Sequence, residues 1–123
     1  MRKTPYIIIG IALLLFASCG RQQAAKSAVK DFVGQYLYED VSYVDFTSVD
    51  STRAISDSLI DVLHRQARPA LGTPDYRPRT GRTLFVIRAN YHVGDDTLSS
   101  TFYLNPDLDG IVAYKDNSTQ IGR

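Results

Sequence analysis

Oxygen-bearing side chains recur at a regular spacing near the C-terminal end of the chain. Alternate oxygen ligands around a glycine that permits a sharp bend are typical of a calcium-binding loop. The alternative is a hairpin turn, because Asn and Asp stand where such loops prefer Asp and Glu, and a Pro, an Asp and a Gly here favour tight turns. We therefore assign no metal ion, and the candidate calcium ligands are Asn105, Asp107, Asp109 and Asp116.

Five arginines are concentrated between positions 65 and 82, where Asp75 is the one acidic residue. Guanidinium groups bind phosphate and carboxylate groups through paired hydrogen bonds, so this segment is a candidate site for an anionic glycan or an envelope protein. The alternative is a solvated loop whose charges keep it out of the core. The candidate binding residues are Arg65, Arg68, Arg77, Arg79 and Arg82.

The two histidines, His64 and His92, are the only candidates for general acid or base chemistry at neutral pH. Such chemistry requires an orienting carboxylate, and Asp45 is the strand-borne candidate. The chain has no glycine-rich phosphate loop, nucleophile elbow or paired-histidine zinc motif. We therefore assign no catalytic residue and no cofactor, and expect a protein that is not an enzyme.

The 8 tyrosines are numerous for 123 residues. Tyrosine combines a large rigid ring with a polar tip, which suits interfaces and glycan-binding surfaces. The alternative is that these rings line a half-buried sheet. Those beyond the N-terminal segment are Tyr36, Tyr38, Tyr43, Tyr76, Tyr91, Tyr103 and Tyr114.

The overall charge is close to balanced, with 14 Lys and Arg against 13 Asp and Glu. This balance argues against nucleic acid as a general partner. The single cysteine, Cys19, excludes an intramolecular disulfide and a cysteine-rich metal site. The length predicts one modest domain.

The N-terminal segment has the composition of a secretory signal. Arg2 and Lys3 precede an apolar run from Tyr6 to Ala17, and small residues follow it. A membrane-spanning helix needs about 20 apolar residues, so this run is too short to span. The alternative is an uncleaved membrane anchor.

The residues Leu15-Phe16-Ala17-Ser18-Cys19 resemble a bacterial lipobox. The resemblance implies removal of residues 1–18 and attachment of lipid to the Cys19 sulfur, which makes a membrane the first partner. In lipoproteins of Bacteroidetes-type bacteria an acidic run after the cysteine accompanies export to the cell surface. Residues 20–24 contain no acid, so the resemblance implies the periplasmic face of the outer membrane.

A helix is expected directly after this segment, with Lys26, Lys30, Asp31 and Gln35 on its polar face. Its apolar face favours packing on a sheet, and the alternative is a helix lying on the membrane surface. The apolar positions at helical spacing are Ala25, Ala28, Val29, Phe32, Val33, Tyr36 and Leu37.

Alternation over Val41–Val49 predicts a strand, with Val44 and Phe46 on one face. A second helix is expected next, capped by Asp50 or Ser51. Its shared face is expected to carry Ile55, Leu59, Val62, Leu63 and Gln66.

Pro69 ends the second helix and begins a long loop over residues 69–82. Three strands follow at hairpin spacing, over Leu84–Val93, Leu98–Leu104 and Ile111–Lys115. They predict an antiparallel meander.

The fold class expected is α+β, with two helices packed on a bent antiparallel sheet of about four strands. This order resembles cystatin-like and nuclear-transport-factor-like domains, and is similar to that of small lipoproteins of Bacteroidetes-type bacteria. The expected divisions are a signal peptide (1–18), a tether (19–23), one domain (24–116) and a disordered tail (117–123).

The leading hypothesis is a non-enzymatic lipoprotein that acts as an interaction or assembly module in the cell envelope. A second is a small-ligand-binding or minor enzymatic domain with a pocket between the first helix and the sheet. A third is an accessory lipoprotein of a secretion or conjugation apparatus.

Overall fold

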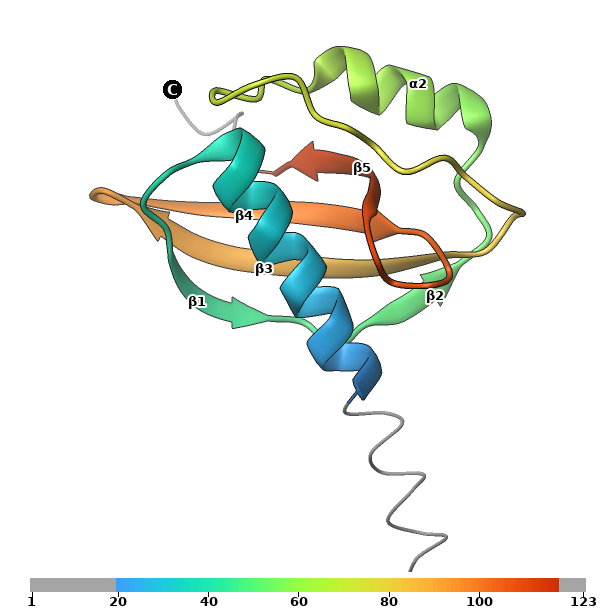
Figure 1. Ribbon diagram of the computed structural model, residues 1–123, viewed down its shortest axis with the longest axis horizontal. Helices are drawn as coiled ribbons and strands as arrows, with labels where there is room; N and C mark the ends of the chain where they lie inside the picture. The colour runs from blue at the N-terminus through green and yellow to red at the C-terminus, as the bar shows by residue number, and fades with distance from the viewer. Residues whose placement is uncertain (1–19, 118–123) are drawn as a thin grey trace, which may run out of the picture.

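The computed structural model describes residues 20–117, which form an N-terminal helix, a second helix and an antiparallel sheet (Figure 1). The expected α+β class is confirmed. The sheet has five strands, in the order β1-β3-β4-β5, with β2 also paired to β3. The strands are β1 (Ser42–Phe46), β2 (Asp50–Thr52), β3 (Leu84–Val93), β4 (Asp96–Leu104) and β5 (Ile111–Asp116). The signal peptide, Cys19 and residues 118–123 lie outside the described residues.

The N-terminal helix crosses one face of the sheet, which we call the helix face (Figure 1). Residues 20–32 are α-helical, and the π-helical turn η1 (Val33–Leu37) continues the helix. The expected apolar stripe is buried against the sheet, so its packing on a sheet is confirmed. Its buried members are Ala25, Val29, Phe32, Val33 and Leu37.

The facing of β1 differs from the expectation. Tyr43 pairs with Tyr91 and Asp45 pairs with Asn90, so Val44 is the extra residue of a β-bulge. The bulge shifts the alternation by one residue. Val44 is therefore 53% exposed, whereas the rings of Tyr43 and Phe46 stack at 5.5 Å between centroids.

The second helix, α2 (Asp57–Gln66), begins later than expected. The predicted caps were wrong, because residues 50–52 pair with β3. Ser56 is the N-cap, and its hydroxyl accepts a hydrogen bond from the Leu59 N–H at 3.1 Å. The predicted face was partly wrong as well, since Leu59 and Gln66 are exposed and Ile60 is buried instead.

The α2 helix covers a second core on the opposite face of the sheet. Ile60 and Leu63 of α2 pack there with Leu84, Val112 and Ala113. Alternate residues of β3 thus serve different cores, because neighbouring side chains on a strand point to opposite faces. The sheet is covered on the helix face by the N-terminal helix and partly on the other face by α2.

The meander of β3, β4 and β5 is confirmed, with β4 two residues longer at its start than expected. Gly94 and Asp95 connect β3 to β4, and Gly94 has a φ of +63°. A positive φ at the first turn residue is typical of a type II′ hairpin, which favours glycine there. In the turn before β5, Leu108 has a φ of +59° and a buried side chain.

Residues 67–83, which we call the strap, return from α2 to β3 across the top of the N-terminal helix and β5 (Figure 1). The Leu71 N–H donates to the Tyr36 carbonyl at 2.9 Å, and the Arg77 N–H donates to the Ile111 carbonyl at 2.8 Å. The Tyr76 ring stacks on His64 at 3.9 Å between centroids. These contacts hold the long loop against both layers of the domain.

Candidate ligand-binding cleft

A cleft of about 490 Å³ lies between the end of the N-terminal helix, the end of α2 and the sheet. Its walls come from the end of η1, from the end of α2 and from three neighbouring strands. The lining residues are Leu37, Tyr38, Leu63, Gln66, Ala67, Arg68, Tyr91, Ser100, Tyr114, Lys115 and Asp116.

The cleft follows from where the helix stops. The backbone becomes extended at Tyr38, so the N-terminal helix leaves the end of the helix face uncovered. Side chains that alternate onto this face, those of Tyr91, Ser100 and Tyr114, then form the floor of the cleft. Because the floor residues lie on the paired strands β3, β4 and β5, the floor is held by the sheet itself.

The polar groups of the floor are already positioned by hydrogen bonds. The Tyr91 hydroxyl and the Ser100 hydroxyl lie 2.8 Å apart and are buried. The Tyr114 hydroxyl accepts a hydrogen bond from the Arg68 backbone. The rings themselves are buried, with Tyr91 1% and Tyr114 5% exposed, so these phenols contribute polar groups at the base of the cleft rather than open ring faces.

Burial raises the pKa of Tyr38, Tyr91 and Tyr114 above the ordinary tyrosine value, and the negative charge of Asp116 adds to each increase. The three phenols are therefore neutral at physiological pH, and each is able to donate one hydrogen bond. Asp116 contributes a carboxylate to the cleft and Arg68 a cation. The cleft thus combines neutral phenol groups with one acidic and one basic side chain.

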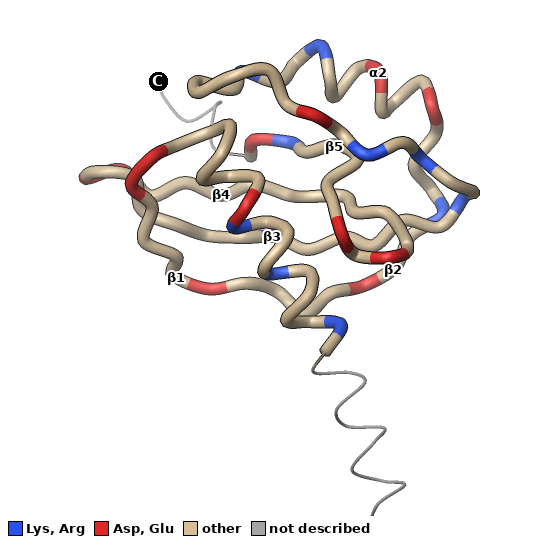
Figure 2. The backbone as a smooth tube through the Cα atoms, in the orientation of Figure 1, with Lys and Arg blue, Asp and Glu red and all other residues tan. Residues whose placement is uncertain are grey.

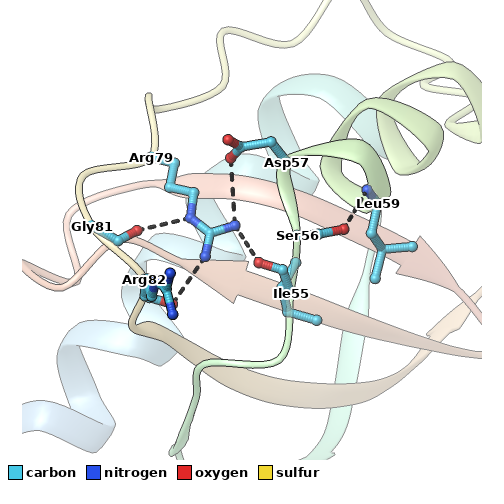
Figure 3. Close-up of polar contacts among 7 residues, drawn as sticks. All are labelled: Ile55, Ser56, Asp57, Leu59, Arg79, Gly81 and Arg82. Atoms are coloured by element: carbon cyan, nitrogen blue, oxygen red, sulfur yellow. Dashed lines mark hydrogen bonds and ion pairs between the residues drawn. The ribbon is translucent and has the colours of Figure 1, made fainter.

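The arginines that were predicted to form one binding loop have different roles. Arg79 holds the strap to the segment before α2 (Figure 3). Its guanidinium donates to the carbonyl of Ile55, to that of Gly81 at 2.8 Å and to that of Arg82 at 3.0 Å, and lies 3.5 Å from Asp57. With a side chain only 15% exposed, Arg79 is a structural residue.

The other four arginines are exposed but not gathered together. Arg77 lies 4.0 Å from Asp109, Arg68 lines the cleft, and Arg65 lies in the last turn of α2. Arg82 lines an open hollow of about 540 Å³ beside Arg79 and Asp57. Figure 2 shows several basic positions near one another where the strap passes the segment before α2, with acidic positions nearby, and Arg53, Arg79 and Arg82 line the same hollow as Asp57.

The candidate calcium ligands do not all lie together in the fold. The Asn105 side-chain amide donates to Asp109 at 2.5 Å, and its oxygen accepts the Asp109 N–H at 3.2 Å. Asp116 lies at the other end of β5, about 17 Å away along an extended strand, and lines the cleft instead. Among residues 20–117, no group of three or more His, Cys, Asp or Glu is arranged to hold a metal ion.

The histidines lie apart from the cleft floor. His64 donates from Nε2 to the Val112 carbonyl at 2.7 Å, and Val112 is the extra residue of a bulge in β5. His92 is exposed and bonded to Thr97 at 3.0 Å, while Asp45 accepts a hydrogen bond from Asn90 at 2.6 Å. Neither His92 nor Asp45 lines the cleft.

Sequence reasoning did not assign the floor of the cleft to any site. The available signal was the excess of tyrosines, several of which fall on strands of the meander. It did not separate Tyr91 and Tyr114 from the tyrosines that pack elsewhere, because the end of the N-terminal helix determines which rings border the cleft.

Comparison of the chain with protein-family models, with curated proteins and with solved structures finds no match.

Within residues 20–117, no helix combines the length and the apolar character needed to cross a bilayer.

Proposed function

We propose that this protein is a cell-envelope lipoprotein, anchored through Cys19, whose domain binds a small molecule in the cleft without transforming it. The observation that carries the binding function is the cleft itself, with the phenols of Tyr91 and Tyr114 and the buried Ser100 hydroxyl on the sheet and the phenol of Tyr38 at the end of the first helix. The lipobox-like residues before Cys19 support the anchor.

The size and lining of the cleft support a small ligand. Small-molecule sites commonly enclose about 300–1,000 Å³ and combine apolar walls with a few placed polar groups. Here Leu37, Leu63 and Ala67 supply apolar wall, and the Tyr91–Ser100 pair supplies a positioned polar group. This corresponds to the second hypothesis, a pocket between the first helix and the sheet.

The structure lends less support to protein capture by the arginine loop. Arg79 already donates to three backbone carbonyls, so its guanidinium is committed within the fold. Arg77 pairs with Asp109, which offsets its charge. We therefore place the binding function in the cleft.

The binding proposal is tested with the full chain in nanodiscs and 4-fluorophenyl β-glucoside as the probe, whose ring and hydroxyls match the lining. We expect saturable broadening of the probe's fluorine NMR signal, beyond that caused by empty nanodiscs. Gln66→Trp places a large ring at the mouth of the cleft and should weaken binding at least tenfold.

The matched control is Gln35→Trp, which makes the same change at an exposed helix position outside the cleft. This variant should bind the probe like the unaltered protein. The proposal would be overturned if the unaltered protein gave no saturable broadening, or if both tryptophan variants bound equally well.

The anchor is tested by mass spectrometry of the protein purified from native membranes. We expect a chain that begins at Cys19 and carries diacylglycerol on the sulfur. A chain that begins at Met1, or that has a free thiol at position 19, would contradict the anchor and leave the binding result standing.

A further inference from the structure

The start of the N-terminal helix is locked to the domain. The Gln22 side chain donates to the Thr47 carbonyl at 2.9 Å and accepts the Val49 N–H at 2.7 Å. The Arg21 guanidinium lies 5.6 Å from the centroid of the Phe85 ring. Residues 20–23, which were expected to belong to a tether, are helical.

Little free chain therefore separates Cys19 from the folded domain. Only Gly20 and Arg21 lie between Cys19 and Gln22, a span of at most about 11 Å for a fully extended chain. Gly20 and Arg21 are themselves helical, which shortens the span further. A lipid on Cys19 would thus bring the start of the helix close to the headgroups.

The cleft lies at the other end of the same helix. Leu37 and Tyr38 line the cleft, and the helix from Gly20 to Leu37 is roughly 25 Å long at its usual rise per residue. Its inner side is buried along this length, from Ala25 to Leu37. Figure 1 shows the helix start beside the β1–β2 connection and the helix end beside α2.

We propose that the N-terminal helix is a rigid post between the bilayer and the cleft, an inference that rests on the lipid anchor proposed above. Residues 47–50 then face the lipid headgroups, and the cleft opens roughly 25 Å farther out in the aqueous compartment. The ligand of the cleft is accordingly a water-soluble molecule and not a lipid of the supporting bilayer.

Site-specific quenching tests the post in the full lipidated chain on phosphatidylethanolamine–phosphatidylglycerol vesicles that carry headgroup nitroxide lipid. Fluorophores are placed at Ser48→Cys, in the β1–β2 connection, and at Asp61→Cys, on α2. Both positions are exposed, and the lipidated Cys19 does not compete for the label. We expect several-fold stronger quenching at position 48 than at position 61.

Equal quenching at the two positions, or stronger quenching at position 61, would contradict the proposal that the N-terminal helix is a rigid post. The control inserts about ten Gly and Ser residues between Cys19 and Gly20, a flexible length that should abolish the difference. Retention of the full difference in that variant would also contradict the post, because the orientation would then not depend on a short connection.

The measurements distinguish a failure of the rigid-post proposal from a failure of the lipid anchor or of ligand binding in the cleft. Protein that does not float with the vesicles would disprove the anchor. Protein that floats, shows equal quenching and still binds the fluorophenyl glucoside would disprove the post alone. A nitroxide-labelled phospholipid that displaces this glucoside from the cleft would disprove the inferred ligand class.

Discussion

At the scale of single residues, the position of a side chain in the fold decides its role more than its type. Arg77 and Arg79 are separated by one proline and looked equivalent in the sequence. In the fold, Arg77 lies exposed beside Asp109, whereas Arg79 points inward to three carbonyls. The run of arginines predicted positive charges in a loop. The partners of these arginines depend on the path of the strap, and no local sequence pattern indicates that path.

Replacement of Arg79 is expected to destabilise the domain. Arg79→Ala removes a charged donor from three carbonyls and should cost about 2–3 kcal/mol in the free energy of unfolding. Arg79→Lys should recover only part of this loss, because a single ammonium group cannot replace a planar fork of donors. Urea unfolding followed by circular dichroism measures both changes.

The control for this prediction is Arg82→Ala, in the same strap. The Arg82 side chain is exposed, and its backbone carbonyl still accepts from Arg79. We expect a change within about 0.5 kcal/mol for this surface substitution. If the two alanine variants lost similar stability, the structural role of Arg79 would be wrong.

At the scale of elements, regular periodicity was informative and local irregularity was not. The apolar stripe of the N-terminal helix and the alternation in β4 predicted the buried faces, because each pattern arises when one face of an element packs on a core. The bulge at Val44 removed Val44 from the face that it was expected to share with Phe46, and Phe46 still packs on the core. The short β2 strand, which took the place of the expected helix cap, depends on pairing with β3 across more than 30 residues.

The β3–β4 hairpin allows a clean test of turn conformation. A methyl group on Gly94 would meet no heavy atom within 4 Å, so Gly94→Ala changes the backbone preference and no packing. The φ of +63° disfavours alanine, and we expect a loss of about 1 kcal/mol in the free energy of unfolding. Thermal or urea unfolding measures this loss.

Asp95→Ala is the matched control in the same turn. Asp95 is exposed and does not have a positive φ, so this substitution should have little effect. A larger loss at position 95 than at position 94 would show that the turn does not have the described conformation.

At the scale of the whole molecule, two cores lie on the two faces of one sheet, and the described tyrosines other than Tyr103 gather at the core of the helix face. The fold class was predictable because the order of helices and strands allows few ways to cover an antiparallel sheet. A pocket between the first helix and the sheet was among the hypotheses, but its lining was not predictable, because the cleft arises where η1, α2 and β5 end at the same place. No single stretch of the sequence indicates that these elements end next to one another in the fold.

The burial of the tyrosines predicts sensitivity to alkaline pH. Burial, together with the charge of Asp31, raises the pKa of Tyr43 to about 12, and the pKa of Tyr38, Tyr76, Tyr91 and Tyr114 is raised as well. The unfolded chain loses these protons first, near pH 10, so stability is retained below pH 10 and falls as the pH rises through the folded pKa values. Urea midpoints should be level from about pH 7 to 9 and fall beyond pH 10.

Tyrosinate absorbance provides an independent measurement of the same effect, because the folded protein should ionise these phenols later than the protein in urea. Tyr43→Phe keeps the stacked ring but removes one phenol, so it should lose less stability between about pH 9 and 11. Identical titration curves for the folded and unfolded protein would contradict the buried state of the tyrosines.

The contacts of Phe32 also constrain the order of events during biosynthesis. Its ring lies 6.3 Å from that of Phe102 and 5.5 Å from that of Tyr114, so the first helix packs on strands that the ribosome completes last. A nascent chain that has not reached β5 lacks the surface on which the helix is buried. The polypeptide is therefore expected to stay unfolded until nearly all of it has been made, a state that the export proposed above would require.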